Sequence, residues 1–304
     1  MDEKVVKYAL QEVEVFKAED FVYYDLQLRR KSGRIDLLFP GWCAGDERVA
    51  IFCPHDDDGL LGAGYALLAA LANAAQVYVF IFCDGRAGYS VPEDRETIVA
   101  RRRAESAAAY SALGVPQENI IRFNYPDFSI MGWLGWILPE GQRGTFYQTL
   151  PALRRLKITR LLVPNGYREH IDHEATFRAG AYDGPQVGDP VLVDWGRAAP
   201  VRSTAIYAVW GDLSPEDALV SGRATNLRGN RAIAVPLVVE EAVMNSLRQF
   251  ASQGQIIEGL VAARAGRRQG GRAIEVYLAF DPRPALDYRP YHAAIADIDG
   301  IRSA

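Results

Sequence analysis

The sequence predicts an α/β protein with a Rossmann-like, mostly parallel sheet that is sandwiched by helices and has an elaborated C-terminal half. From residue 48 onward, short apolar runs rich in β-branched residues alternate with longer segments of helical composition. Two of these runs end abruptly in clusters of polar residues, which is typical of the ligand-binding edge of an open α/β sheet. Because parallel neighbours need crossover connections, the alternation predicts helices on both faces of the sheet.

The expected elements follow from this alternation. Strands are expected at 49–53, 77–83, 120–123 and 161–163, and helices at 60–74, 93–113, 146–156 and from His173 to Tyr182. Gly114 is a typical helix stop, whereas Pro151 is expected to kink or restart its helix. Further strands are expected at 204–210, 233–239 and 274–280, with a continuous helix over 240–264.

The first 46 residues are expected to form an N-terminal extension, followed by one domain over 47–304. They carry no recognisable chemistry, but 21–28 and 34–39 have the composition of two strands that add an edge or a lid. No internal repeat or low-complexity linker divides the rest of the chain. The apolar C-terminal elements could support a homo-oligomer.

The composition limits the classes of function. Apolar residues make up 49% of the chain, which supports a sizeable core, and the net charge of −4 argues against a broad basic surface for nucleic acid. The three cysteines lack C-x-x-C spacing and the N-terminus lacks the pattern of a signal peptide, so a reducing, cytoplasmic location is expected. Asn73 and Gln76 interrupt the apolar stretch 65–83, which predicts a buried helix and strand rather than a membrane span.

The first polar cluster, His55-Asp56-Asp57-Asp58, directly follows the strand 49–53. Three adjacent carboxylates in a confined site repel one another, and a bound cation relieves that repulsion directly. The neighbouring imidazole makes a transition metal a better fit than calcium. The alternative is a solvated acidic turn with an incidental histidine.

The second cluster, 168–173, reads Arg-Glu-His-Ile-Asp-His and closes the strand 161–163. Three of the chain's four histidines therefore lie in the two clusters. Both clusters end strands, so a parallel sheet would bring them together. Catalytic zinc takes about three protein ligands and keeps one position open, and two histidines with one carboxylate meet that need.

The pairing of P-H-x-D-D with a later H-x-D-H resembles the zinc-dependent N-deacetylase family of LmbE-like and PIG-L-like proteins. Those enzymes remove acyl groups, usually acetyl, from the nitrogen of amino sugars such as N-acetylglucosamine. Shorter pieces of the family pattern recur in order within residues 48–280: Cys83-Asp84-Gly85, Arg102-Arg103-Ala104-Glu105 with Leu113-Gly114, Asn124-Tyr125-Pro126-Asp127, and Ser252-Gln253. The ordered set is more specific than any single piece.

The resemblance implies a metal site made from both clusters. His55, Asp58 and His173 occupy the positions of the family's zinc ligands, although another divalent transition metal would suit the same ligand types. Zinc with an open position lowers the pKa of a bound water to about 7 and polarises an amide carbonyl.

The resemblance also implies catalytic and substrate-binding residues. Asp57 would take the proton of the attacking water, and His170 would stabilise the oxyanion or protonate the leaving amine. Asp172 would orient His170, as carboxylates orient histidine in hydrolytic triads. Arg102 is expected at the rim of the substrate site, and Asp127 in the family's short substrate-binding loop.

Three positions depart from the family pattern. Asp56 stands where the family usually has proline, and it adds negative charge beside the metal. Gly59 stands where glutamate is usual, and losing a supporting carboxylate typically changes affinity or rate by about 10–100-fold. Arg168 stands where some members have tyrosine. These changes bear on substrate and rate but leave the metal ligands intact.

The leading hypothesis is a zinc-dependent hydrolase that cleaves a linear amide and removes an acyl group, usually acetyl, from the nitrogen of an amino sugar or its conjugate. One alternative changes the amide, for example to a thiol conjugate, and another is a retired family member that binds sugar or metal without turnover. Single roles also have structural alternatives: Asp57 could merely hydrogen-bond its turn, and Arg102 could pair with Glu105 on the helix surface.

Overall fold

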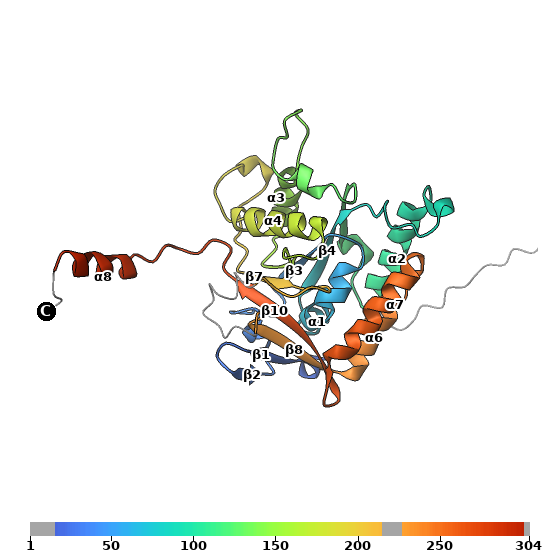
Figure 1. Cartoon of the computed structure of the whole chain (residues 1–304), viewed down its shortest axis with the longest axis horizontal. Coiled ribbons are helices and arrows are strands. Elements are labelled where there is room, and N and C mark those ends of the chain that lie inside the picture. The colour runs from blue at the N-terminus through green and yellow to red at the C-terminus, as the bar shows by residue number, and fades with distance from the viewer. Residues whose placement is uncertain (1–15, 215–226, 301–304) are drawn as a thin grey trace, which may run out of the picture.

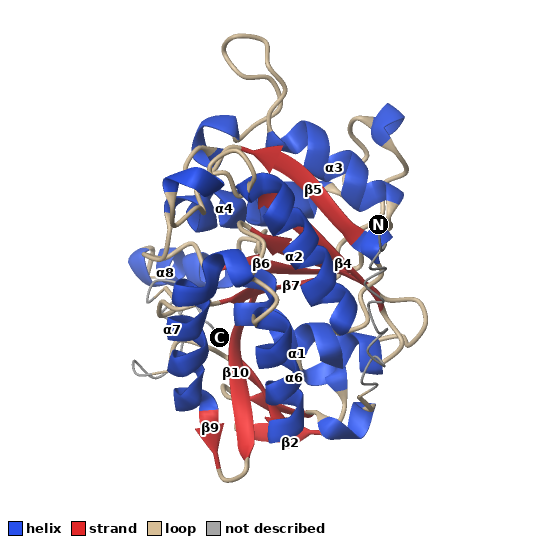
Figure 2. Cartoon of the chain, turned by 90° about the vertical axis from the view of Figure 1, so that its right-hand side faces the viewer, coloured by secondary structure: helices blue, strands red, loops and turns tan. Residues whose placement is uncertain are grey.

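The structure, a computed structural model, describes residues 16–214 and 227–300. Its strands form one ten-stranded sheet in the order β2-β1-β8-β10-β7-β6-β3-β4-β5, with β9 paired to β10. Helices cover both faces of this sheet (Figures 1 and 2). The predicted α/β class with a helix-covered sheet is confirmed.

The half of the sheet that leads to the polar clusters is parallel. β3 (Arg48–Cys53) lies between β4 (Gln76–Cys83) and β6 (Arg160–Pro164), with β5 (Ile120–Tyr125) and β7 (Ser203–Tyr207) outside them. The chain passes from β3 to β4 and β5 on one side, and then returns to β6 and β7 on the other. This reversal opens a crevice at the carboxyl ends of β3 and β6, where both clusters follow.

The other half is antiparallel and joins the two ends of the chain. β10 (Arg272–Phe280) pairs with β7, with β8 (Arg231–Pro236) and with the short β9 (Arg268–Gln269). β8 also pairs with β1 (Val22–Asp25), whose outer neighbour is β2 (Arg30–Ser32). The described part of the N-terminal extension is thus hydrogen-bonded into the same sheet. That residues 1–46 are an extension and 47–304 one domain remains a prediction.

A buried ion pair ties this extension to β6. The fully buried Arg160 donates to both carboxylate oxygens of Glu47, at 2.9 and 3.0 Å, and to the carbonyls of Pro40 and Gly41 at 2.8 and 3.0 Å. Although burial opposes it, the hydrogen bonds from Arg160 and Thr159 lower the pKa of Glu47 to about 2. Glu47 therefore stays charged, and it fixes residues 40–47 against the start of β6.

Two helical layers bury the two faces of the sheet. One layer holds α1 (Asp58–Ala72), α2 (Ile98–Ala112), α6 (Leu237–Leu247) and α7 (Gly254–Ala263), and the other holds α3 (Thr145–Arg155) and α4 (Ile171–Gln186). Side chains of β3 alternate between the layers: Val49 and Ile51 pack in the first core, and Ala50 and Phe52 in the second. A strand buried on both faces is apolar throughout, which explains the continuous apolar runs.

The apolar stretch 65–83 divides into the rest of α1 and the strand β4, as the sequence predicted. Within the two described ranges, no helix is both long and apolar enough to cross a membrane. The last helix, α8 (Arg289–Ile298), stands apart from the body at the end of an extended segment (Figure 1).

The expected strand at 34–39 is wrong. This segment contains a short 3-10 helix, Ile35–Leu37, and the strand lies earlier, at β2. Ile35, Leu38 and Phe39 are all buried, so the segment turns several neighbouring side chains into one core instead of alternating between two faces.

The expected continuous helix over 240–264 is also wrong. α6 and α7 are separated by a 3-10 turn, Ala251–Gln253, in which the backbone N–H of Ser252 bonds the Glu105 side chain and not a helix carbonyl. In contrast, α3 continues through Pro151 without a restart. Leu150 and Leu153 are fully buried on either side of this proline, and their packing holds the helix together.

Asp183 in α4 gives a prediction about stability and pH. This buried carboxyl group accepts a hydrogen bond from the Thr149 hydroxyl at 2.7 Å, and burial raises the pKa of Asp183 to about 7. The folded state keeps a proton that the unfolded chain releases near pH 4, so the contribution of Asp183 to stability should fall as the pH rises from about 4 to 7 and then level off. Asp183→Asn should remove this part of the slope and raise the free energy of unfolding at pH 8 by on the order of 1–4 kcal/mol relative to the native protein.

Denaturant unfolding between pH 5 and pH 8 measures this difference. Glu96→Gln, which changes an exposed carboxylate, is the matched control and should keep the native slope. An unchanged slope in Asp183→Asn would contradict the buried, protonated carboxyl group.

Candidate metal centre

His55, Asp58 and His173 converge at the crevice between β3 and β6. The Asp58 carboxylate oxygen Oδ2 lies 3.2 Å from His55 Nδ1 and 3.3 Å from His173 Nε2. Tetrahedral zinc with bonds of 2.0–2.2 Å separates its ligand atoms by about 3.3–3.5 Å. His55 stands just before α1, Asp58 begins that helix, and His173 lies in the first turn of α4. The sheet topology has therefore brought the two sequence clusters together.

The environment of His173 Nε2 indicates whether these residues fit a metal. His173 Nε2 is buried and forms no well-aligned hydrogen bond, although Asp58 Oδ2 lies 3.3 Å away, while the other ring nitrogen of His173 contacts Glu169 Oε2 at 2.9 Å. Leaving a buried polar atom unpaired is costly unless a ligand occupies its lone pair. Two imidazoles and one carboxylate, with room for a fourth ligand, match the donor set of catalytic zinc.

His55 also belongs to two other convergent sets in the described residues. One joins it to His170 and Asp172, and the other to Cys83 and Asp127. Only the set with Asp58 and His173 contains a buried nitrogen without a partner. Among the three sets, that one therefore fits a metal best.

The charges at the cluster suit a cation. Although burial opposes it, His173 and His55 hold the pKa of Asp58 well below its usual range. Burial likewise opposes the charged imidazoles, but Asp58 raises the pKa of His173 to about 9, and Asp172 with Asp58 raises the pKa of His55. Without a metal the cluster thus holds protons, and metal binding would displace them.

Glu169 is a site residue that was not singled out from the sequence. Its Oε1 accepts hydrogen bonds from the backbone N–H groups of Val209, Trp210 and Gly211 at 2.9, 3.2 and 2.7 Å, while its Oε2 holds His173. Such carboxylate partners fix the orientation of a ligand histidine. The signal in the sequence is the four-residue spacing of glutamate and histidine, but the anchoring loop after β7 could not be foreseen.

Asp172 lies at the centre, where it is close to both His55 and His170. Its Oδ2 is 3.4 Å from His55 Nε2 and accepts the Phe128 N–H at 2.6 Å, and its Oδ1 accepts the Ile130 N–H at 3.3 Å. His170 Nδ1 is farther away, at 3.7 Å. Two amides in the turn after β5 fix the carboxylate, which lies nearer to His55 than to His170, and its predicted role in orienting His170 remains a prediction.

His170 is oriented by the backbone. It caps the N-terminus of α4, where its Nδ1 accepts the Asp172 N–H at 3.1 Å. Burial and the neighbouring His55 lower the pKa of His170. A neutral ring that accepts at Nδ1 carries its proton on Nε2, so His170 presents a donor at the site.

Asp57 is buried beside the cluster and is absent from the convergent ligand sets of the described residues. Its Oδ1 lies 3.5 Å from Arg102 Nη2. Burial raises the pKa of Asp57, while Arg102 opposes the shift. The geometry is compatible with the predicted role of a base that does not bind the metal.

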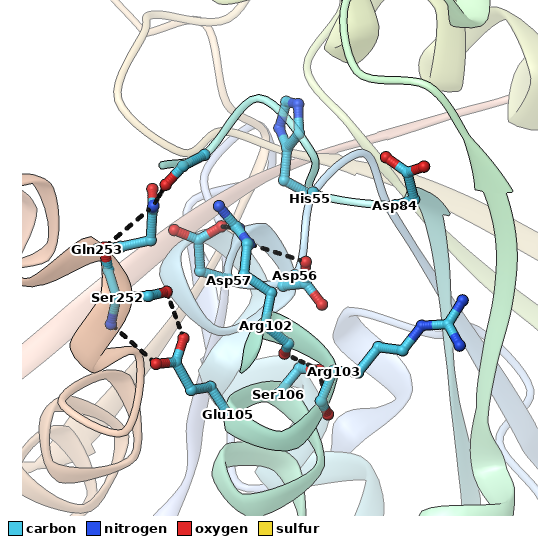
Figure 3. Close-up of polar contacts among 12 residues, drawn as sticks. His55, Asp56, Asp57, Asp84, Arg102, Arg103, Glu105, Ser106, Ser252 and Gln253 are labelled. Carbon is cyan, nitrogen blue, oxygen red and sulfur yellow. Dashed lines mark hydrogen bonds and ion pairs between the residues drawn. The ribbon is translucent and has the colours of Figure 1, made fainter. Parts of the chain in front are cut away.

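The charge that Asp56 adds beside the candidate site is paired with arginines. Asp56 is fully buried and turns toward Arg102, whose Nε donates to it at 3.1 Å (Figure 3). Arg122 Nη2 also donates to its second oxygen and to the Ser106 hydroxyl. Two guanidinium groups therefore neutralise the residue that replaces the usual proline. A proline at position 56 could not pair with these arginines, so this departure from the family pattern belongs with the arginines around it.

The two predicted substrate-binding side chains are engaged within the protein. Arg102 is only 4% exposed and lies beneath the site, between Asp56 and Asp57, not at a rim. Asp127 accepts the N–H groups of Gly85 and Ala87 at 3.0 and 2.7 Å. Substrate contact by either residue remains a prediction.

The other family-like pieces also meet in space. Ser252 donates its hydroxyl and its N–H to Glu105, at 2.6 and 2.8 Å, and the Gln253 amide donates to the Gly88 carbonyl (Figure 3). Glu105 is therefore not the surface partner of Arg102, because it joins α2 to the turn before α7. These contacts hold the loop after β4 beside Arg102.

Gly59 is explained by its neighbours. A Cβ atom at this position would lie 2.6 Å from Cys53 Sγ and 2.7 Å from the Tyr110 hydroxyl. Both contacts are shorter than real Cβ atoms allow. The usual glutamate has no room here, because a tyrosine from α2 and a cysteine from β3 fill its space.

Comparison with known proteins identifies the source of this pattern. Residues 50–182, which hold both clusters, match the family described as PIG-L: GlcNAc-PI de-N-acetylase. The resemblance to the PIG-L (LmbE-like) family is confirmed. A search of curated proteins found no significant match.

Solved structures extend the PIG-L-like fold to most of the chain. The N,N'-diacetylchitobiose deacetylase of Pyrococcus horikoshii has a TM-score of 0.59 at 18% identity, over 78% of this chain and 84% of its own. The conserved protein TT1542 of Thermus thermophilus has a TM-score of 0.57 at 21% identity, over 78% and 96%. The 4-carboxy-2-hydroxymuconate hydratase of Pseudomonas putida has a TM-score of 0.58 at 14% identity, over 79% and 99%. Since a hydratase shares the fold, the fold alone does not specify the reaction.

Glu169 gives a prediction about metal affinity. Glu169→Gln should weaken zinc binding by about 10–100-fold, because the amide supports His173 less strongly and no longer stabilises the metal-bound ring. Competition with a calibrated chelator measures the affinity. Glu174→Gln on the same helix changes an exposed partner of Arg178 and should keep native affinity. Equal affinities of the two variants would argue against the proposed ligand role of His173.

Asp56 gives a prediction about stability. Asp56→Ala leaves Arg102 and Arg122 without their shared counter-ion, so the free energy of unfolding should fall by about 3–5 kcal/mol. Urea unfolding measures this loss, and the double variant Asp56→Ala/Arg122→Met should recover part of it. Glu174→Ala, which breaks an exposed pair, should change stability by less than about 1 kcal/mol.

Proposed function

We propose that this protein is a zinc-dependent hydrolase that removes an acyl group, most simply acetyl, from the nitrogen of an amino sugar or its conjugate. The observation that carries the proposal is that His55, Asp58 and His173 lie together and that the buried Nε2 of His173 makes no hydrogen bond. The carboxylate of Asp57, which belongs to none of the ligand sets, is buried beside them. Zinc held by these residues would supply an activated water and polarise the amide carbonyl. The overall reaction converts an amide and water into a free amine and a carboxylate.

Asp57 is the proposed general base. Burial raises its pKa, which makes the carboxylate a better proton acceptor than an exposed aspartate. Arg102, 3.5 Å away, opposes this rise in the pKa of Asp57 and favours the ionised form. The base thus takes a proton from the water that attacks the carbonyl carbon.

His170 is the proposed donor to the developing oxyanion. Its Nδ1 is occupied by a backbone N–H, so the proton on Nε2 can bond the carbonyl oxygen as negative charge builds there. The leaving nitrogen must gain a proton as the C–N bond breaks, and the proton collected by Asp57 is available for it.

Two exposed aromatic side chains flank these histidines. The Phe128 ring lies 4.6 Å from His170, and the Trp210 ring lies 4.8 Å from His173. Phe128 is 63% exposed and has a φ of 62°, a conformation that non-glycine residues rarely adopt and that functional sites often retain. We propose that these rings pack on the sugar, since binding sites commonly present aromatic walls with a few oriented polar groups.

The substrate class is supported by similarity. The matching family description names a de-N-acetylase of GlcNAc-PI, and one structural neighbour is a deacetylase of N,N'-diacetylchitobiose. Both names denote N-acetylated amino sugars. We therefore expect this chain to act on an amide of the same chemical class.

Asp57→Asn gives the decisive prediction. With a panel of N-acetylated amino sugars, zinc-loaded native protein should release free amine, whereas Asp57→Asn should lose about 10²–10⁴-fold in kcat and keep its zinc. Amine release is measured by fluorogenic labelling, and zinc by elemental analysis. Asp36→Asn, at the surface, is the control and should keep native activity. Stable zinc without amine release by the native protein would instead favour an unusual amide or a retired binding module.

A further inference from the structure

We propose that α8 is an arm that packs on a second copy of this chain. The proposal rests on the described C-terminal residues and is independent of the reaction at the metal centre. α8 is a ten-residue helix in which no side chain is buried, and it stands clear of the body (Figure 1).

One face of the arm carries an apolar stripe. Tyr288, Tyr291, Ile295 and Ile298 follow one another at intervals of three, four and three residues, which places them on one side of a helix. They are 60%, 56%, 55% and 82% exposed. Large apolar side chains in a continuous stripe mark a surface that is covered by a partner.

The arm's own helix formation also points to a partner. Isolated helices shorter than about 12–15 residues are marginal in water, and most helical stability in proteins comes from packing of an apolar face. α8 has ten residues, which is shorter than that limit, so its helix needs a surface against which the stripe can pack.

The segment that leads to α8 contacts the body through Arg283. Arg283 forms two hydrogen bonds with the Asp189 carboxylate, at 2.9 and 3.0 Å. Pro282 and Pro284 flank this arginine and restrict the backbone on either side of it. This exposed ion pair adds little stability, but it marks where the arm leaves the body, from which α8 extends away (Figure 1). We therefore look for the surface that covers the stripe on another molecule.

Charge argues against a membrane as that partner. Residues 281–300 contain four aspartates, two arginines and no lysine. Of the two arginines, Arg289 lies within α8. Helices that lie on anionic membranes carry lysine- and arginine-rich polar faces. The acidic arm fits a protein surface better than a lipid one.

The symmetry of the stripe favours a second copy over an unrelated protein. The stripe is centred on position 293, so in an antiparallel pair Tyr288 would face Ile298 of the second copy and Tyr291 would face Ile295. A two-fold contact requires such a self-complementary patch. The exposed tyrosines and isoleucines of both arms would supply the apolar part of a contact, and specific interfaces begin at roughly 1,200 Å².

The test compares two single substitutions that add the same charge to opposite faces of α8. Ile295→Glu places a carboxylate in the stripe, whereas Ala293→Glu places one on the far side of the helix. Sedimentation velocity of the full chain over a range of concentrations measures the dissociation constant of the dimer. Ile295→Glu should raise it at least about tenfold, as expected for loss of a central interface contact, and Ala293→Glu should leave it within about threefold.

Three outcomes would overturn the proposal. They are a native chain that stays monomeric at all concentrations, a dimer that Ile295→Glu leaves intact, and equal weakening by both substitutions. Thermal unfolding of each variant checks that the body still folds. Amine release and zinc content should not change in either variant, so failure of the arm is distinguishable from failure of the proposed hydrolase.

Discussion

The contact of one carboxylate with two imidazoles is the interaction on which the rest of the site depends. Asp58 Oδ2 lies within 3.3 Å of nitrogen atoms from both His55 and His173, although these residues are more than a hundred positions apart in the chain. Parallel strands make the contact possible, because the carboxyl ends of β3 and β6 lie at the same edge of the sheet. A bound cation would replace protons that the cluster otherwise holds.

Hydrogen bonds and close contacts with neighbouring groups hold each of the three converging residues in place. Glu169 holds His173, and three backbone amides hold Glu169. Asp172 lies against His55 and is itself fixed by two amides from the turn after β5. The backbone N–H of His55 donates to Asp58 at 2.8 Å. Rings fixed in this way need little reorganisation when they bind a metal, which is how surrounding contacts raise affinity.

Much of the fold and the identity of the site residues followed from the sequence. Alternating apolar runs and helical segments determined the strands β3 to β6 and their helices, because packing on both faces of a parallel sheet permits only such a pattern. The polar residues that follow β3 and β6 predicted a metal site at this edge of the sheet, and the family resemblance implied His55, Asp58 and His173 as its ligands. These polar residues are close together in the sequence, so their clustering can be seen without the fold.

Only the tertiary structure decided the partners of those residues. Asp172 lies nearer to His55 than to His170, and Asp56 pairs with Arg102 and Arg122. Ser252 lies in a turn between two helices and bonds Glu105. Each of these side chains had several chemically suitable partners, and the choice depended on which distant segments the sheet and its helices brought within about 3 Å. Residue type limits what a side chain can bind, but the packed fold selects which partner it meets.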